Sequence, residues 1–559
     1  MKPTMEILEK INQNSNNNKE EIFTKLYRYL LRPDIYFVAY QNLYANKGAA
    51  TRGVNDDTAD GFSEEKVNKI IKNLAGGSYQ PNPTRRAYIT KANGKLRPLG
   101  LPTFTDKLVQ EVLRMILEAI YEPVFLKYSH GFRPKRSCHT ALQEIKYSFK
   151  GTRWFIEGDI KGCFDNIDHS VLIGIINTKI KDARFIQLIY KFLKAGYLEG
   201  WRYANTYSGT PQGGIISPIL ANIYLHELDK FMDKLKADFD KPIPNKSLNP
   251  EYNVARRKVE IIRLKLNRDN AINREELVSE LKEARTTMLK LPARLQADKI
   301  IKYIRYADDF IIGIKGSKED CEHIKAKLKT FIGDTLKMEL SEDKTLITHS
   351  NEYARFLSYD IRVRRNSKIK KDCNGITRRP LSNSVEMNVP LKDKIEKFLF
   401  NNKAVIVKNG ALFPKERTGL IRLTDLEIIM TYNAELRGIC NYYNLASNFG
   451  SLSYFSYLME YSCLKTLAAK YKSSISKIMR KFKDGRGGWS IPYETKKGKK
   501  RMNFAKFRDC LTKLYPSDSK PLVKNWHMRS SGSFEKRLKE CPCQLCGTEN
   551  AEHYEIHHV

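Results

Sequence analysis

Residues 304–312 read IRYADDFII and place two adjacent carboxylates, Asp308 and Asp309, between two apolar runs. Apolar runs on either side of a short polar stretch are typical of a β-hairpin, and here the polar stretch carries negative charge. An isolated Asp-Asp pair is more often a solvated turn than a binding site. The segment therefore predicts a hairpin with an acidic turn, whose function depends on what the chain brings beside it.

Residues 154–167 read WFIEGDIKGCFDNI, an apolar strand that ends at Asp159. Three carboxylates can then converge from neighbouring strands. In nucleotidyl transfer, two Mg²⁺ ions about 3.5–4 Å apart clamp the attacking and the leaving oxygen, and Mg²⁺ is usually held by one or two carboxylates together with substrate phosphates. The two segments together predict a Mg²⁺ site with Asp159 and Asp308 as its first ligands.

These segments resemble motifs A and C of the polymerase palm, and the form Tyr-Ala-Asp-Asp is typical of reverse transcriptases. The resemblance implies that Asp159, Asp308 and Asp309 are catalytic and that Ile160 completes the metal-binding set. Phe164 follows Asp159 closely, so its ring is expected to stand beneath the sugar of the incoming nucleotide and to exclude a ribose 2′-hydroxyl.

Two further segments indicate contact with nucleotide or template. SGTPQGG, residues 208–214, is a loop punctuated by Gly and Pro that leads into a predicted helix, and Gln212 would be its polar reader. GKLRPLG, residues 94–100, is a turn followed by a basic strand. In the resembling family this strand meets the incoming triphosphate, which makes Lys95 and Arg97 nucleotide-binding candidates. The alternative is that these cations are ordinary surface charges.

Three segments narrow the resemblance to group II intron-encoded proteins of the LtrA type. They are FRPKRSCH at residues 132–139, TYSGTPQGG at 206–214 and RGICNYY at 437–443. The match runs nearly end to end. It implies a maturase that binds its group II intron RNA and flanking exons and promotes splicing. It also implies a reverse transcriptase that uses deoxynucleoside triphosphates to copy RNA at a DNA target during intron mobility.

One residue departs from the family pattern. Ser358 stands in the segment RFLSYDI, residues 355–361, where the family usually has Gly. Gly adopts positive φ readily, whereas a residue with a Cβ does so at a cost. If the turn requires positive φ, the sequence predicts local strain at this point, on the primer side of the site.

Composition and charge indicate a large protein with a polyanionic partner. The chain has 559 residues, and 98 Lys and Arg against 63 Asp and Glu give a net charge of +35. Such an excess of positive charge favours nucleic acid as the binding partner. No stretch approaches the roughly 18 consecutive apolar residues of a spanning helix, and the N-terminus does not read as a signal peptide. We expect a cytoplasmic bacterial protein without a membrane partner, associated with the nucleoid when on target DNA.

The expected fold class is a multidomain α+β right-hand polymerase with fingers and palm, an N-terminal helical extension, an α-helical thumb and a small basic DNA-binding region. In the extension, helical spacing up to Ile11 is followed by a predicted polar break at residues 12–18. The expected domains are an N-terminal extension (1–80), fingers and palm (81–365, with a helical insertion at 238–298), a thumb or maturase domain (366–490), a DNA-binding region (491–540) and a partial HNH endonuclease (541–559).

Basic side chains outside the predicted site are candidates for contact with nucleic acid. They are Arg133, Arg136, Lys496, Lys497, Lys499, Lys500 and Arg501. The last segment resembles the first half of an HNH nuclease, with Cys543 and Cys546 as metal ligands and His557 and His558 as endonuclease candidates. A structural Zn²⁺ usually needs four ligands, and a second Cys pair does not follow. We therefore expect Zn²⁺ only in a complete domain, and endonuclease activity lost by truncation.

Two other functional readings remain open at this stage. An RNA-binding splicing factor could retain the fold without polymerase activity, although the three Asp positions are intact. A reverse transcriptase of the retron or diversity-generating type would share the predicted site, although the maturase-like and HNH-like segments disfavour it.

Overall fold

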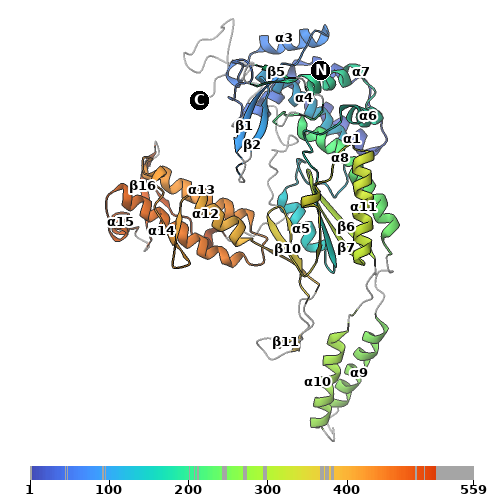
Figure 1. Cartoon of the computed structure of the whole chain (residues 1–559), viewed down its shortest axis with the longest axis vertical. Helices are drawn as coiled ribbons and strands as arrows, with labels where there is room; N and C mark the ends of the chain where they lie inside the picture. Colours follow the sequence, from blue (N-terminus) through green and yellow to red (C-terminus); the bar gives the residue numbers. More distant parts are fainter. Residues whose placement is uncertain are drawn as a thin grey trace.

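The computed structural model of the protein describes residues 3–510, except for a set of short segments. Those left out are residues 45, 47, 91–93, 95, 200–201, 205, 207, 211–212, 242–248, 268–273, 292, 294–298, 366–369, 372–376, 379–382, 485–487 and 496–497. Figure 1 shows a central body with two arms. Residues 397–510 form a helical arm on one side, and residues 250–290 form a second arm that points away from the body.

A four-stranded sheet, here called the central sheet, lies in the middle of the body. Its strands follow the order β6 (Ile300–Tyr306), β7 (Asp309–Lys315), β3 (Trp154–Asp159) and β8 (Leu346–His349), and all neighbours are antiparallel. β6 and β7 form the predicted hairpin, and β3 ends at Asp159 as the sequence predicted.

Side chains of the central sheet alternate between two hydrophobic cores, because successive residues of a strand point to opposite faces. Phe310 and Ile312 lie in the first core, whereas Ile311 and Phe155 lie in the second. The helices that contribute to the first core include α4 (Phe104–Tyr121), α8 (Ser217–Phe239) and α11 (Lys318–Asp334). Helix α5 (Cys138–Ser148) contributes to the second core.

A second four-stranded sheet is formed by strands that precede and follow β3 in the chain. Its strands follow the order β2 (Leu96–Leu101), β1 (Thr84–Thr90), β4 (Tyr197–Glu199) and β5 (Arg202–Ala204). The pair β1 and β2 is the turn and basic strand predicted around residues 94–100. Helices α6 (His169–Lys179) and α7 (Ala183–Lys194) fill the chain between β3 and β4.

The N-terminal extension is helical, but the predicted polar break at residues 12–18 is wrong. Helix α1 runs without interruption over Thr4–Asn17. Asn12 Nδ2 and Ser15 Oγ donate hydrogen bonds to the carbonyls of Ala119 and Ile120 at the end of α4, so polar residues of α1 serve its packing. The extension continues with α2 (Pro33–Tyr44) and α3 (Glu64–Ala75).

The predicted helical insertion is confirmed as an antiparallel pair, α9 (Pro250–Leu266) and α10 (Arg274–Lys290). The pair has a small core of its own, formed by Val259, Ile262 and Ala284. Figure 1 shows it projecting from the body as the second arm.

The helical arm follows a three-stranded sheet that borders the central sheet. That sheet has the order β13-β10-β9. Helix α13 starts with a capping box, in which Thr424 and Glu427 exchange side-chain and backbone hydrogen bonds. The elements of this part are β9 (Ala354–Phe356), β10 (Tyr359–Val363), β11 (Lys370–Lys371), β12 (Thr377–Arg378), β13 (Val385–Asn388), α12 (Lys397–Asn401), β14 (Val405–Lys408), β15 (Ala411–Pro414), α13 (Asp425–Tyr442), α14 (Leu452–Lys470), α15 (Ile475–Lys481), β16 (Ser490–Thr495) and β17 (Gly498–Asn503).

The hairpin of β16 and β17 belongs to the same packed unit as α13 and α14. Ile491 and Phe504 are buried in the second core with residues of both helices, and Asn433 of α13 donates to the carbonyl of Asn503. The predicted start of a DNA-binding region at residue 491 therefore falls inside a packed unit. Among the helices described, none combines the length and the apolar character needed to cross a membrane.

The turn between β9 and β10 has positive φ at both central residues, with φ 46° at Leu357 and 58° at Ser358. This pattern defines a type I′ turn, which strongly prefers Gly, Asn or Asp. Two tyrosines at the end of α13 hold the turn. Tyr442, the last residue of the helix, donates to the carbonyl of Leu357 at 2.6 Å, and Tyr443, its C-cap, donates to that of Ser358 at 3.3 Å. The strain that the sequence predicted for Ser358 is present.

Adding a methyl group at Gly158 should destabilise the central sheet. A Cβ at this position would lie 2.0 Å from the ring of the buried Phe310, and overpacking of this kind typically costs about 1–3 kcal/mol. Gly158→Ala should therefore lower the thermal unfolding midpoint. Gly174→Ala on helix α6 is the matched control, since a Cβ there meets open space; equal midpoints for the two variants would contradict the packing.

Ser358→Gly should stabilise the protein, because the left-handed conformation costs a residue with a Cβ roughly 1 kcal/mol. The free energy of unfolding in urea should rise by up to that amount. Leu357→Gly should do the opposite, since the Leu357 side chain packs against the second core. A loss of stability in Ser358→Gly would show that the hydroxymethyl group serves a purpose beyond filling the turn.

Candidate active site

Three carboxylates meet at one end of the central sheet, as the sequence predicted. Asp159 is the last residue of β3 and stands directly opposite Asp309, the first residue of β7. Asp308 lies in the intervening turn after Ala307, which has a φ of 56°. The antiparallel register therefore brings together side chains that are about 150 positions apart in the sequence.

Burial and neighbouring negative charge raise the pKa of Asp308 and of Asp309. Desolvation by the surrounding protein and then the charges of Asp308 and Asp159 raise the pKa of Asp309 to about 7. Desolvation also raises the pKa of Asp308, with Asp159 adding to the effect, while Arg97 and Lys344 act in the opposite direction. Confining like charges in a site of reduced solvation favours the protonated form. The cluster is consequently an environment that a cation would stabilise.

Lys344 is a functional candidate that the sequence reasoning missed. Its Nζ lies 2.6 Å from Oδ2 of Asp159, and its side chain is 68% exposed. It precedes β8, the strand that pairs with β3. The signal in the sequence is a lysine just before an edge strand of the same sheet. This signal can be recognised only when the order of the strands is known.

The donor set suits Mg²⁺, which prefers oxygen ligands. In the part of the chain that the structure describes, no group of three or more His, Cys, Asp or Glu side chains is arranged to hold a metal ion, and Lys344 takes one oxygen of Asp159. The mutual repulsion that raises the pKa of Asp309 is what a divalent cation would relieve. Ile160 has a buried side chain, so only its backbone carbonyl could contribute.

Residues 208–210, at the start of the predicted loop, dock on the segment that follows Asp159. Thr210 donates its backbone N–H to the carbonyl of Phe164 at 2.7 Å, and Gly209 donates to that of Ile167 at 2.8 Å. The ring of Phe164 meets that of Phe132 edge to face, with 6.3 Å between the centroids. Two predicted motifs are thus in contact beside the carboxylates. Gln212 and Lys95 lie outside the described residues, whereas Arg97 on β2 is exposed.

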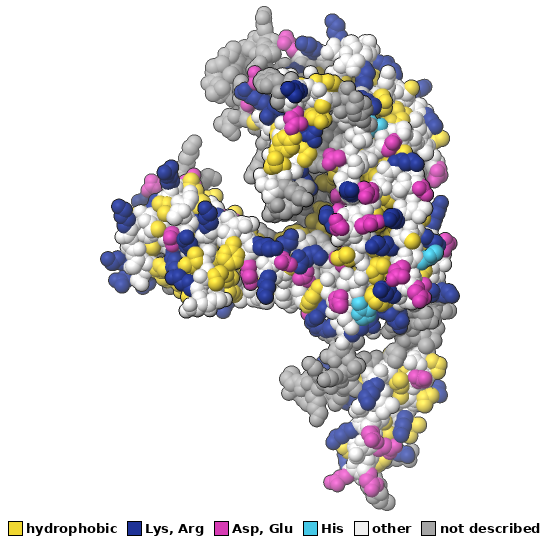
Figure 2. Space-filling view, in the orientation of Figure 1, with side chains coloured by type: hydrophobic (Ala, Val, Ile, Leu, Met, Phe, Trp, Pro, Cys, Tyr) yellow, Lys and Arg dark blue, Asp and Glu magenta, His cyan; other side chains and the backbone are white. Residues whose placement is uncertain are grey.

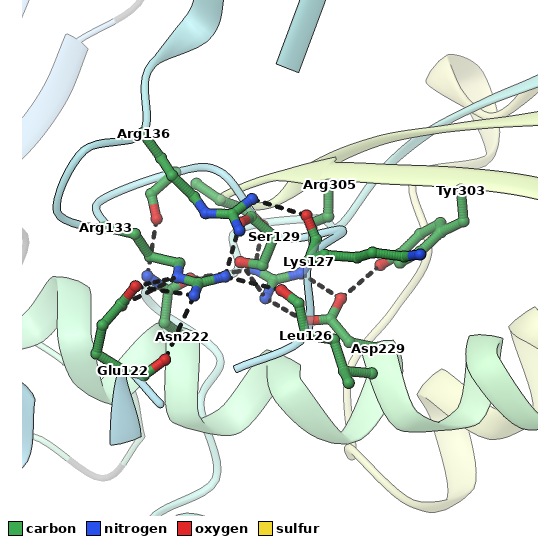
Figure 3. A network of polar contacts seen from close by, with 12 residues as sticks. Glu122, Leu126, Lys127, Ser129, Arg133, Arg136, Asn222, Asp229, Tyr303 and Arg305 are labelled. Atoms are coloured by element: carbon green, nitrogen blue, oxygen red, sulfur yellow. Dashed lines mark hydrogen bonds and ion pairs between the residues drawn. The ribbon is translucent and has the colours of Figure 1, made fainter. Parts of the chain in front are cut away.

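The prediction that Arg133 contacts nucleic acid does not fit the structure. Its side chain is only 4% exposed and pairs with Glu122 at 2.8 Å, and Nη1 donates to the carbonyls of Leu126 and Ser129 (Figure 3). A guanidinium whose donors are taken by protein acceptors cannot also bind phosphate. Arg136 donates to the carbonyl of Lys127 and stays partly exposed, so its role remains a prediction.

Three basic residues of the β16–β17 hairpin, Lys499, Lys500 and Arg501, are exposed on β17. Arg501 also donates to Oγ of Ser490 at 2.6 Å and to the carbonyl of Lys483 at 3.1 Å. Other predicted residues lie outside the described part of the chain, namely Lys496, Lys497, Cys543, Cys546, His557 and His558.

Comparison with known proteins defines the class. Residues 89–241 match the family model described as reverse transcriptase (RNA-dependent DNA polymerase), and residues 382–520 match the type II intron maturase model. The chain therefore combines an RNA-directed DNA polymerase with an intron maturase.

Two relatives specify the family. The chain is 59% identical to the group II intron-encoded protein LtrA of Lactococcus lactis subsp. cremoris, over 100% of this chain and 94% of the relative. It is 34% identical to a putative COX1/OXI3 intron 2 protein of Saccharomyces cerevisiae, over 99% of this chain and 63% of the relative. The chain belongs to the group II intron-encoded proteins and is a reverse transcriptase and maturase of that family.

Proposed function

We propose that this protein binds its own group II intron RNA with the flanking exons, promotes splicing, and makes cDNA by target-primed reverse transcription from deoxynucleoside triphosphates during intron mobility. The observation that carries the proposal is the convergence of Asp159, Asp308 and Asp309 in a chain that also matches the intron maturase model. A splicing factor without polymerase activity would not need this assembled cluster. A retron-type enzyme would not need the maturase match. The protein would act in the bacterial cytoplasm and would associate with the nucleoid when it binds target DNA.

The three carboxylates would hold Mg²⁺, with the carbonyl of Ile160 as a further ligand. Bound there, the metal would stabilise charge on the attacking and leaving oxygens. Arg97 would meet the triphosphate, and the action of its charge on Asp308 supports this role. Lys344, which pairs with Asp159, offsets part of the negative charge of the cluster. Phe164 would stand below the sugar.

The division of labour follows the expected domains. We assign the central sheet to the palm, the β1–β2 sheet to the fingers, and residues 366–490 to the thumb. Figure 2 displays Lys and Arg side chains over the body and both arms, in keeping with a net charge of +35. Grip on RNA phosphates would then be spread over the N-terminal extension (1–80), the insertion (238–298) and the thumb. A DNA-binding region and an HNH segment after residue 491 remain the expectation for target recognition.

Replacing Asp308 or Asp159 by Asn should abolish primer extension and leave RNA affinity nearly unchanged, because these side chains would bind metal and not phosphate. Primer extension on an RNA template with Mg²⁺ and RNA binding by filter retention measure the two effects. Asp343→Asn is the matched control, since Asp343 is an exposed carboxylate next to Lys344. Incorporation by Asp308→Asn at the wild-type rate would overturn the site assignment. Loss of splicing stimulation together with primer extension would contradict the proposal that splicing and copying use different parts of the protein.

Phe164→Val should raise the use of ribonucleotides relative to deoxyribonucleotides. A smaller side chain leaves room for the 2′-hydroxyl, while the backbone carbonyl that anchors Thr210 is retained. The ratio of the two kcat/KM values, measured with both nucleotides in competition, reports the change. An unchanged ratio in an active variant would remove Phe164 from the role of gate.

A further inference from the structure

The buried guanidinium of Arg305 contacts the turn that joins β6 and β7 and carries Asp308. Arg305 is the penultimate residue of β6, and its side chain and that of Asp229 on helix α8 are both 0% exposed. Nε and Nη2 of Arg305 donate to the two oxygens of Asp229 at 2.8 and 2.6 Å, and the hydroxyl of Tyr303 donates to the same carboxylate at 2.9 Å. Figure 3 shows this pair between β6 and α8.

Desolvating two charges is expensive, and a buried pair is often replaceable by apolar residues without loss of stability. Overall stability is therefore a poor explanation for this pair. The remaining donors suggest a different purpose. Nη1 of Arg305 donates to the carbonyl of Ala307 at 2.9 Å, and Ala307 is the left-handed residue immediately before Asp308. The guanidinium thereby holds the backbone that aims a catalytic carboxylate.

A neighbouring segment closes the other side of the turn. The backbones of Arg305 and His130 are joined at 2.9 Å, and Ser129 Oγ accepts from Nη2 of Arg305. A Cβ at Gly131 would lie 2.4 Å from the backbone nitrogen of Ala307, so this segment touches the turn directly. Asn222 of α8 joins the two, since its Oδ1 accepts from Arg305 and its Nδ2 donates to the carbonyl of Gly131.

Helix α8 is also the helix that follows the loop at residues 208–214. The Arg305–Asp229 pair consequently joins two parts of the proposed site, namely the loop expected to contact nucleotide or template and the turn that carries Asp308. Since a displacement near 1 Å in a catalytic group can cost about 100-fold in rate, a fixed reference between them would matter for the chemical step.

We propose that Arg305 is a positioning residue for nucleotidyl transfer, which sets Asp308 relative to helix α8 through its bonds to Asp229 and to the carbonyl of Ala307. The inference rests on the proposed polymerase function of the three carboxylates. It assigns no contact with substrate to Arg305. Its effect should therefore appear in the rate of the chemical step more than in the binding of nucleotide.

The test replaces the pair by apolar residues of similar size, Arg305→Met with Asp229→Leu, so that no charge is left buried alone. The thermal unfolding midpoint and RNA affinity should stay close to wild type. Single-turnover primer extension should show kcat reduced by roughly 100-fold, with KM for deoxynucleotide changed only slightly. A folded double variant with wild-type kcat would overturn the proposal, as would a rise in KM at constant kcat.

Arg305→Lys decides the matter if the double variant fails to fold. An ammonium keeps the buried charge balanced, but a point charge cannot span both oxygens of Asp229 and the carbonyl of Ala307 as a planar guanidinium does. Reduced kcat in this folded variant supports positioning, and wild-type kcat overturns it.

Tyr303→Phe is the matched control. It removes one hydrogen bond to Asp229 from the same network without touching the turn, so kcat should be retained. A loss of kcat in Tyr303→Phe as large as in Arg305→Lys would show that the network as a whole, and not the bond to Ala307, is what matters. Failure of the proposed function is distinguishable, because it would appear as extension by Asp308→Asn or as no extension by the wild-type protein.

Discussion

The pairing of β3 with β7 is the constraint on which the rest of the site depends. Its register sets Asp159 opposite Asp309, and like charges directly opposite on neighbouring strands are destabilising. Apolar side chains on both faces of the central sheet hold this register in place, while the cationic side chain of Lys344 offsets part of the repulsion. Hydrophobic packing thus offsets the repulsion between negative charges that are concentrated at one end of a sheet.

Local pattern was enough to predict the elements that carry the site. The hairpin at residues 300–315 and the strand ending at Asp159 depend on residues that are neighbours in sequence. The paired insertion helices followed from apolar spacing in the same way. The sequence predicted strain at Ser358 only if the turn requires positive φ, because the residue type alone does not determine the conformation of a turn.

Two of the features that sequence reasoning missed depend on partners far along the chain. Lys344 meets Asp159 across 185 positions, and the polar residues of α1 find acceptors on α4 more than a hundred positions away. Arg133 was predicted to contact nucleic acid, yet its side chain pairs with Glu122 of the same protein. Charge type gives no indication of whether a side chain faces solvent. The packing of β16–β17 against α13 likewise became visible only from the shared core.

The position of the insertion in the chain has a consequence for folding and for variation among relatives. Helices α9 and α10 lie between α8 and β6, so Asp229 and Arg305 must find each other across 76 positions of chain. The entropic cost of closing a loop grows only logarithmically, by about 0.6 kcal/mol for each doubling of its length. The second arm can therefore lengthen, shorten or be exchanged at little thermodynamic expense to the site, provided that its two ends return to the same places.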